Sequence, residues 1–329
     1  MAKVSTRRKA RPRRASMTVA LLAAAMTAAL AAGCTGGNGP AEDGRGRLQT
    51  PVPDQSPTGA SVLAVKIDNA PAARPQTGLN TADVVYAEQV EGGLSRLMAV
   101  YATTLPQVVG PVRSARESDL ELLRQYDDPT LAFSGAQGKL LPLIDRAPLQ
   151  AEPPGKASDA YFRGTDKAAP HNLYLRPARL MSSPPGAAAL TNGFRYGAAP
   201  AGGKPETTRT VRFPAARFTF TWSPTKHSYS VAMDGTPTVS PDGKEAAPAT
   251  VVVQHVKVRK SDFHDFLGNN TPYTETVGSG KAEVLRDGRV YDVDWKREQA
   301  TDGTDFTTPD GKPVNFAKGQ VWVVLAKAG

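Results

Sequence analysis

The stretch SVLAVKIDN, residues 61–69, decides how the first half of the chain folds. Apolar and β-branched side chains fill it almost without interruption, and it ends in the polar pair Asp68-Asn69, a pattern typical of a buried strand. Residues 82–90 and 97–103 predict two further strands, and Glu91-Gly92-Gly93 predicts the turn between them. The first half of the chain therefore begins as a sheet.

Helical signals follow these strands. Ser114 is followed three residues later by Glu117, which is the pattern of a capping box. Apolar residues then recur at helical spacing as far as Tyr126, so a helix is predicted to begin at Ser114. Shorter elements are expected at 130–133 (strand), 137–145 (helix) and 177–182 (helix). Strands mixed with helices predict a mixed α/β domain over residues 61–190.

The pattern changes after a segment rich in proline, glycine and alanine, and we take residues 191–208 as a linker. Strand-like runs then occupy 217–222, 228–233, 250–258, 282–286, 290–295 and 320–325. Five Asp-Gly pairs, a common hairpin-turn dipeptide, punctuate this half, and no helical spacing stands out. Residues 209–329 are thus expected to form a mainly antiparallel β domain, and the whole chain an α+β fold of two domains.

The amino-terminal end has the features of an export signal. Seven basic and no acidic residues precede the apolar stretch 17–32, and the run LAAGC ends at Cys34, the only cysteine. We therefore expect residues 1–33 to be a lipoprotein signal peptide and Cys34 to be lipidated. The protein would then sit at the cell membrane through its lipid anchor, on the extracytoplasmic side. An uncleaved anchor helix is the alternative, and both the Sec and the twin-arginine routes stay open.

Composition excludes several classes of function. Residues 34–60 contain almost no large apolar side chain and are expected to form a disordered tether. The formal net charge of +9 becomes +2 when the seven basic residues of the signal are removed, which argues against nucleic acid as a partner. With Cys34 acylated, no thiol remains for disulfides or nucleophilic catalysis. No histidine spacing or phosphate-binding loop indicates a metal or cofactor, so none is expected.

The densest polar cluster lies in the first half of the chain, and it supplies the candidate site. Carboxylates at strand ends beside arginines can bind an anion or work as acid and base, although they also fit ion pairs that fix strand register. Arg113 and Arg116 flank the predicted helix start, where backbone N–H groups favour an anion. No residue is given a catalytic role. The candidates for ligand binding are Asp68, Asn69, Arg74, Glu91, Arg96, Arg113, Ser114, Arg116, His171 and Asn172.

Several motifs together resemble the YerB-like lipoprotein family. They are VKIDN (65–69), ARPQTGL (73–79), ADVVY (82–86), VEGG (90–93), GPVRSAR (110–116), APHNLY (169–174), VVVQ (251–254) and GQVWVV (319–324). The resemblance extends from residue 61 to the end of the chain. It implies a two-part extracytoplasmic lipoprotein with a mixed first domain, a separate carboxy-terminal domain and no established catalytic activity. Ala87 departs from the pattern, since an acidic residue is expected after Tyr86.

These observations predict a membrane-anchored binding protein for an anionic component of the cell envelope, either a cell-wall polymer or an envelope protein. A cell-wall-directed hydrolase or transferase is the first alternative, with Asp68, Glu88 or Glu91 as acid and base. Two carboxylates about 5–10 Å apart in one cleft would favour it. An assembly factor for a membrane complex is the second alternative, and a large exposed apolar patch would favour that reading.

Overall fold

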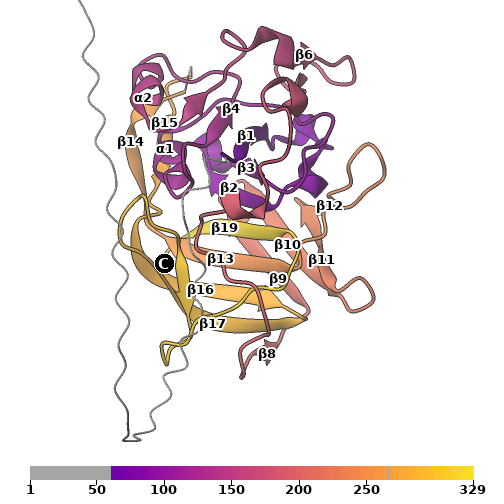
Figure 1. Cartoon of the computed structure of the whole chain (residues 1–329), viewed down its shortest axis with the longest axis vertical. Helices are drawn as coiled ribbons and strands as arrows, with labels where there is room; N and C mark the ends of the chain where they lie inside the picture. The colour runs from indigo at the N-terminus through magenta and orange to yellow at the C-terminus, as the bar shows by residue number, and fades with distance from the viewer. Residues whose placement is uncertain (1–60, 266) are drawn as a thin grey trace, which may run out of the picture. The chain divides into compact units, whose positions relative to one another are not determined.

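The computed structural model describes residues 61–265 and 267–329, which Figure 1 shows in colour. The predictions for the signal peptide, for Cys34 and for the tether concern residues outside this range. All described residues belong to one compact unit. Within them, no helix has both the length and the apolar character needed to cross a membrane.

One large sheet of eleven strands organises the molecule. Its strands are β1 (Leu63–Asp68), β2 (Val84–Gln89), β3 (Ser95–Tyr101), β4 (Thr130–Ala132), β5 (Gln150–Ala151), β8 (Lys204–Pro205), β13 (Thr250–Val256), β16 (Gly278–Arg286), β17 (Arg289–Arg297), β18 (Asp305–Thr307) and β19 (Val321–Lys327). They follow the order β18-β17-β16-β13-β19-β2-β3-β1-β4-β5, and β8 pairs with β17. Both halves of the chain therefore contribute to the same sheet. The division into domains at residues 61–190 and 209–329 therefore remains a prediction from the sequence.

The last strand, β19, joins the two halves. It lies between β13 and β2 and is parallel to both, which departs from the antiparallel pattern expected for the second half. Six of its residues, Val321 to Ala326, are buried one after another, as in a strand that is covered on both faces. Figure 1 shows this strand crossing the middle of the molecule.

A second, four-stranded sheet covers one face of the large sheet. Its strands are β9 (Thr208–Phe213), β10 (Ala216–Ser223), β11 (Ser228–Met233) and β12 (Thr236–Pro237), in the order β12-β11-β10-β9. Phe218 and Phe220 of β10 meet Trp322 of β19 edge-on, with ring centroids 6.3 and 5.9 Å apart. These aromatic contacts lie in the core between the two sheets.

The opposite face of the large sheet is covered by α1 (Glu117–Leu123) and α2 (Leu141–Arg146), whose buried residues Leu122, Leu123 and Ile144 join a second core. The hairpins β14–β15 (Val258–His264 and Asn270–Thr274) and β6–β7 (Tyr161–Arg163 and Leu173–Leu175) complete the strands. Short 3₁₀ helices are η1 (Pro71–Ala73), η2 (Leu79–Thr81), η3 (Glu91–Gly93), η4 (Ser158–Ala160), η5 (Pro177–Arg179) and η6 (Ala187–Ala189). The fold is mainly β, as expected for residues 209–329, whereas an α+β fold was expected for the whole chain. With two such short α-helices, the mixed α/β description of residues 61–190 has only partial support.

The predicted helix start at Ser114 is wrong. Helix α1 begins at Glu117, and the Asp119 carboxylate accepts a hydrogen bond from the Arg116 backbone N–H at 2.7 Å. Ser114 stays outside the helix because the backbone on either side of it pairs with residues 134–135 in an extended conformation. Pairing of the backbone with a neighbouring segment thus prevails over the local capping signal at Ser114. The Asp119 carboxylate already accepts the hydrogen bond at the start of the helix, where an anionic ligand was expected.

Candidate functional site

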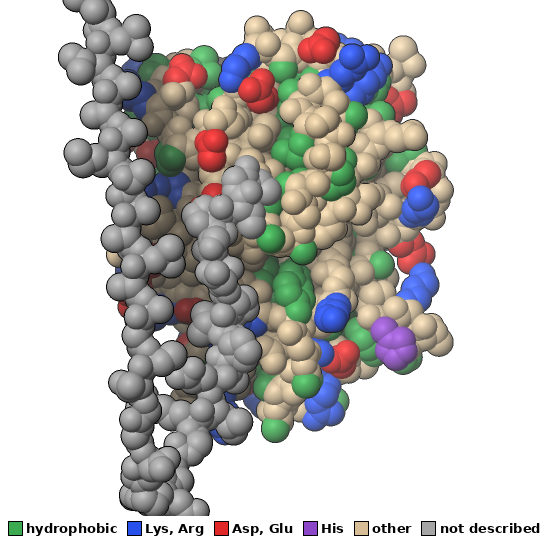
Figure 2. Space-filling view, viewed as in Figure 1, with side chains coloured by type: hydrophobic (Ala, Val, Ile, Leu, Met, Phe, Trp, Pro, Cys, Tyr) green, Lys and Arg blue, Asp and Glu red, His purple; other side chains and the backbone are tan. Residues whose placement is uncertain are grey.

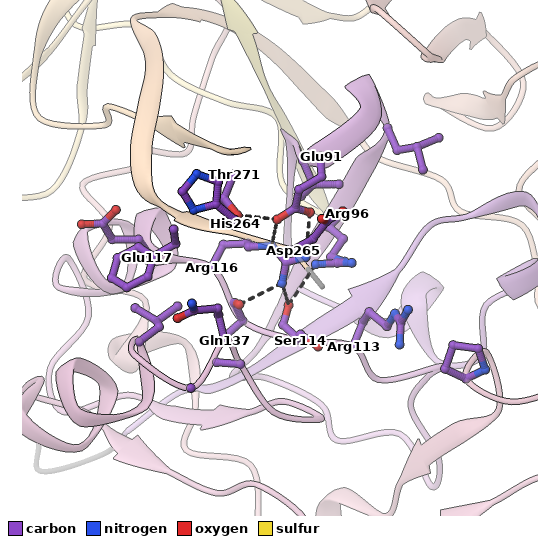
Figure 3. A pocket seen from close by; sticks show the side chains of 18 residues that line it. Glu91, Arg96, Arg113, Ser114, Arg116, Glu117, Gln137, His264, Asp265 and Thr271 are labelled. Carbon is purple, nitrogen blue, oxygen red and sulfur yellow. Dashed lines mark hydrogen bonds and ion pairs between the residues drawn. The ribbon is translucent and has the colours of Figure 1, made fainter. Parts of the chain in front are cut away.

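A pocket of about 720 Å³ lies between the large sheet, the start of α1 and the hairpin β14–β15 (Figure 3). Its wall contains five of the candidate residues, namely Glu91, Arg96, Arg113, Ser114 and Arg116. The rest of the wall includes Glu117, Gln137, Leu140 and the hairpin residues His264, Asp265 and Thr271. Segments far apart in the sequence therefore meet here.

Strand register brings the charged groups together. Arg96 of β3 lies directly opposite Asp68 of β1 on one side and Glu88 of β2 on the other. Residues that pair directly across strands place their side chains on the same face. The three side chains thus form a charged row on the face that carries α1.

The tight turn after β2 positions Glu91. Gly92 and Gly93 have φ angles of 68° and 73°, in the left-handed region that glycine adopts without strain. A Cβ atom on Gly93 would also lie only 2.6 Å from a side-chain atom of Pro214. The turn therefore requires glycine, and it fixes Glu91 at the pocket wall.

Glu91 and Arg116 form the best-defined ion pair of the pocket. Arg116 donates from Nε and from a terminal nitrogen to the two carboxylate oxygens at 2.6 and 2.7 Å. Thr271 donates a further hydrogen bond to Glu91 at 2.6 Å. Burial alone would raise the pKa of Glu91, but the hydrogen bonds and charge of Arg116, with Thr271, hold this pKa below its ordinary value of 4.5. Glu91 is therefore ionised at neutral pH, and Arg116 is neutralised by it.

The Glu91 pair makes a prediction about acid stability. A carboxylate whose pKa is lower in the folded protein stabilises it above the unfolded value, and this contribution is lost as the pH falls through the folded pKa. We expect Glu91→Gln to be less stable than the parent protein at pH 7. The difference should shrink as the pH falls below about 4.5, the ordinary value for glutamate. Urea unfolding from pH 7 to pH 3 measures it, and a difference independent of pH would contradict the assignment.

Arg96 has few partners by comparison. Among the described residues, its guanidinium donates one hydrogen bond, to the Ser114 carbonyl oxygen at 3.3 Å, and its buried Nε has none. Burial, followed by the like charge of Arg116, lowers the pKa of Arg96 to about 10. The group is still cationic at neutral pH. Arg96 is thus a partly buried positive charge at the pocket wall, with a buried Nε that has no partner.

Asp68 links a second small cluster to the pocket. One oxygen, Oδ2, contacts Nε of Arg113 at 3.2 Å and Nδ1 of His171 at 2.8 Å. The other oxygen accepts a hydrogen bond from the Ala70 N–H at 3.1 Å. Arg113 lines the pocket, so Asp68 and His171 lie directly beside it.

The remaining candidates point elsewhere. Asn69 accepts a hydrogen bond from Arg74, whose guanidinium also pairs with Asp234 at 2.8 Å and so ties the end of β1 to the second sheet. Asn172 accepts a hydrogen bond from Arg163 at 2.7 Å within its own hairpin. These three residues hold loops in place, whereas the sequence grouped them with the pocket arginines.

Of the three carboxylates named for the hydrolase alternative, Asp68, Glu88 and Glu91, only Glu91 lines the pocket. Glu88 is buried away from the pocket, where it contacts Lys66 and accepts a hydrogen bond from Ser118 at 2.9 Å. Glu91 is held ionised by Arg116. Neither group is placed to donate a proton into the pocket. In the described part of the chain, no group of three or more histidine, cysteine or acidic side chains is arranged to hold a metal ion.

Comparison with known proteins identifies the family. Residues 49–189 match the N-terminal domain, and residues 209–323 the C-terminal domain, of a protein family of unknown function, DUF3048. The protein described as "Putative lipoprotein YerB" of Bacillus subtilis (strain 168) is 26% identical over 292 residues, which is 82% of each chain. The crystal structure of YerB from Bacillus subtilis matches with a TM-score of 0.66 at 21% identity, over 81% of this chain and 90% of that one, and shows the shared fold. The resemblance seen in the sequence is thereby confirmed, and the chain belongs to the two-part YerB-like family.

Proposed function

We propose that this protein is a lipid-anchored, extracytoplasmic binding protein whose pocket takes an anionic group of a cell-envelope ligand. The observation that carries the proposal is the Arg96 guanidinium, a partly buried cation at the pocket wall whose buried Nε has no partner among the described residues. A charge-assisted hydrogen bond to a carboxylate or phosphate would satisfy this donor. The signal peptide predicted for residues 1–33, directly before Cys34, and the lipoprotein name of the relative support the anchor and the location.

The charges around the pocket support an anionic ligand. Arg116 is neutralised by Glu91, and Arg113 shares Asp68 with His171. The other acids of the wall do not reach Arg96. Asp265 accepts hydrogen bonds from backbone and side-chain N–H groups of its own turn, and Figure 3 shows Glu117 at the opposite side of the pocket from Arg96. Burial also raises the pKa of Glu117.

The positive charge of Arg96 lies in a pocket, whereas the charges on the outer surface are mixed in sign. On the face shown in Figure 2, acidic and basic side chains are interspersed and do not gather into one large patch of a single sign. A surface of that kind gives no strong long-range attraction for a polyanion. The proposal therefore places recognition in the pocket, whose volume of about 720 Å³ falls within the usual range for ligand sites.

Substitution of Arg96 tests the proposal. We expect Arg96→Gln to weaken binding of the full-length protein to a purified envelope fraction roughly tenfold or more, because a hydrogen bond to a charged group contributes about 1.5–3 kcal/mol. Co-sedimentation in mild detergent measures the binding. Inorganic phosphate, added as a competitor, should displace the parent protein.

Arg212→Gln is the matched control. Arg212 is an exposed arginine of β9, outside the pocket wall, so this variant makes the same change in net charge. Its binding should equal that of the parent. If both variants bind as the parent does, or if both lose binding equally, the pocket is not the anion site.

A further inference from the structure

Exposed leucines occur in the segments that border the arginine pocket. Among the described residues, five large apolar side chains are exposed by more than a third, namely Leu94 (38%), Leu141 (38%), Leu143 (36%), Tyr196 (39%) and Leu267 (71%). The four leucines lie in the pocket wall or within three residues of it, and only Tyr196 lies elsewhere. Single exposed apolar residues need no explanation, but four in segments that border one pocket suggest an interaction surface.

The fold brings the segments that carry these leucines to one pocket. Leu94 belongs to the wall itself, next to the turn that holds Glu91. Leu141 and Leu143 follow the wall residue Leu140 at the start of α2, and Leu267 follows the wall residue Asp265 in the turn of the hairpin β14–β15. In Figure 1, α1, α2, β14 and β15 lie together at one end of the molecule. We call Leu94, Leu141, Leu143 and Leu267 the leucine rim.

Apolar side chains beside a partly buried cation match one kind of molecule, an amphiphile with a negatively charged head. The phosphate of a membrane lipid can accept hydrogen bonds from arginine, while leucine side chains enter the boundary between headgroups and acyl chains. A wall polymer has a charged group but no hydrocarbon layer into which the leucines could insert. The combination therefore favours a lipid headgroup over a soluble anion.

The position of the predicted anchor supports the same occupant. The sequence predicts that residues 35–60 connect an acylated Cys34 to the folded part of the chain. A flexible chain of that length has a typical span on the order of 30 Å. A tether of that length would keep the folded part of the chain close to the bilayer that carries the lipid anchor.

We propose that the leucine rim docks on the membrane surface, and that Arg96 binds the phosphate of an anionic phospholipid headgroup there. This inference rests on the proposed function, since it assigns the anionic group of the ligand to a lipid. It goes further by naming a docking surface and the orientation in which the body lies on its own membrane.

Hydrogen exchange on the full chain tests the orientation without removing the anchor. The protein is reconstituted in nanodiscs of phosphatidylcholine alone or of phosphatidylcholine with phosphatidylglycerol. We expect backbone amides of residues 141–146 and 267–270 to exchange roughly tenfold more slowly in the anionic discs, because docking excludes water from both segments. Equal exchange in the two kinds of disc would overturn the proposal.

Three variants separate the contributions. Leu94→Ser combined with Leu267→Ser should abolish the slower exchange, and so should Arg96→Gln. Tyr196→Ser, at the exposed apolar residue outside the leucine rim, should retain it. All four positions are at least partly exposed, and circular dichroism verifies that each variant is folded.

The outcomes distinguish this inference from the proposed function. If the double leucine variant keeps the protection, docking through the rim is wrong, while envelope binding through Arg96 can still hold. If free glycerol 3-phosphate protects the same amides in phosphatidylcholine discs, the ligand is a soluble anion and the lipid assignment is wrong. If Arg96→Gln keeps both the protection and its binding to envelope fractions, the proposed function fails as well.

Discussion

Lys66→Met is expected to lower the free energy of unfolding by about 3–5 kcal/mol, the usual cost of removing one partner of a buried ion pair. The Lys66 side chain is fully buried in β1, and its Nζ contacts the Glu88 carboxylate and Asp119 Oδ1, the latter at 2.6 Å. Methionine would preserve most of the volume but leave two carboxylates buried side by side without a cation. Urea unfolding at pH 7 measures the loss.

The pH dependence shows whether charge or packing causes that loss. Burial, with the nearby charge of Glu88, raises the pKa of Asp119 to about 6 even beside Lys66. Removing the lysine should raise this pKa further. A carboxyl group with a raised folded pKa binds more protons in the folded state, so stability increases as the pH falls through that pKa. The difference in the free energy of unfolding between Lys66→Met and the parent protein should therefore become smaller as the pH falls from 7 to 5.

Lys281→Met is the control. Lys281 pairs with Asp294 at 2.5 Å, but its side chain is 76% exposed, and an exposed pair contributes only about 0–1 kcal/mol. If Lys281→Met lowered the free energy of unfolding as much as Lys66→Met does, burial would not determine how strongly these ion pairs stabilise the protein.

Local patterns in the sequence predict the strands well. The runs at 61–69, 82–90 and 228–233 all contain strands, because β-branched and aromatic side chains fit a pleated, half-buried surface. The partner of each strand is not a local property. A buried run such as β19 shows that a strand is covered on both faces, but nothing in it specifies β2, more than 200 residues earlier, as its neighbour.

The site was predictable to the extent that it depends on neighbouring strands. Arg96 and Glu91 lie near the turn between β2 and β3, so their meeting follows from one hairpin. In the sequence, Arg74 and Asn172 cannot be told apart from the polar residues of the pocket. Their loops nevertheless direct their side chains toward other partners. Thr271 and Leu267 come from a hairpin of the second half, and no spacing in the sequence connects them to Glu91. Tertiary packing decides which polar residues share a pocket.

Trp322→Ala is expected to destabilise the protein by about 3–5 kcal/mol, the range for deleting a large buried aromatic side chain. Trp322 is fully buried between the two sheets, where it contacts Phe218 and Phe220. Its indole N–H donates to Gln320 Oε1 at 2.9 Å. Truncation would leave a cavity in the core and a side-chain acceptor without its donor. Thermal and urea unfolding measure the change.

Trp222→Ala is the control, because Trp222 is only partly buried at the margin of the same core, and its loss should lower the free energy of unfolding by less.

The two faces of the large sheet also predict how Trp322→Ala affects binding. Trp322 packs on the side of the small sheet, whereas Arg96 shares its face with Met98 and the α1 core. At a temperature where Trp322→Ala is still folded, its binding to the envelope fraction should equal that of the parent. A tenfold loss of binding would mean that the core between the two sheets controls the shape of the arginine pocket.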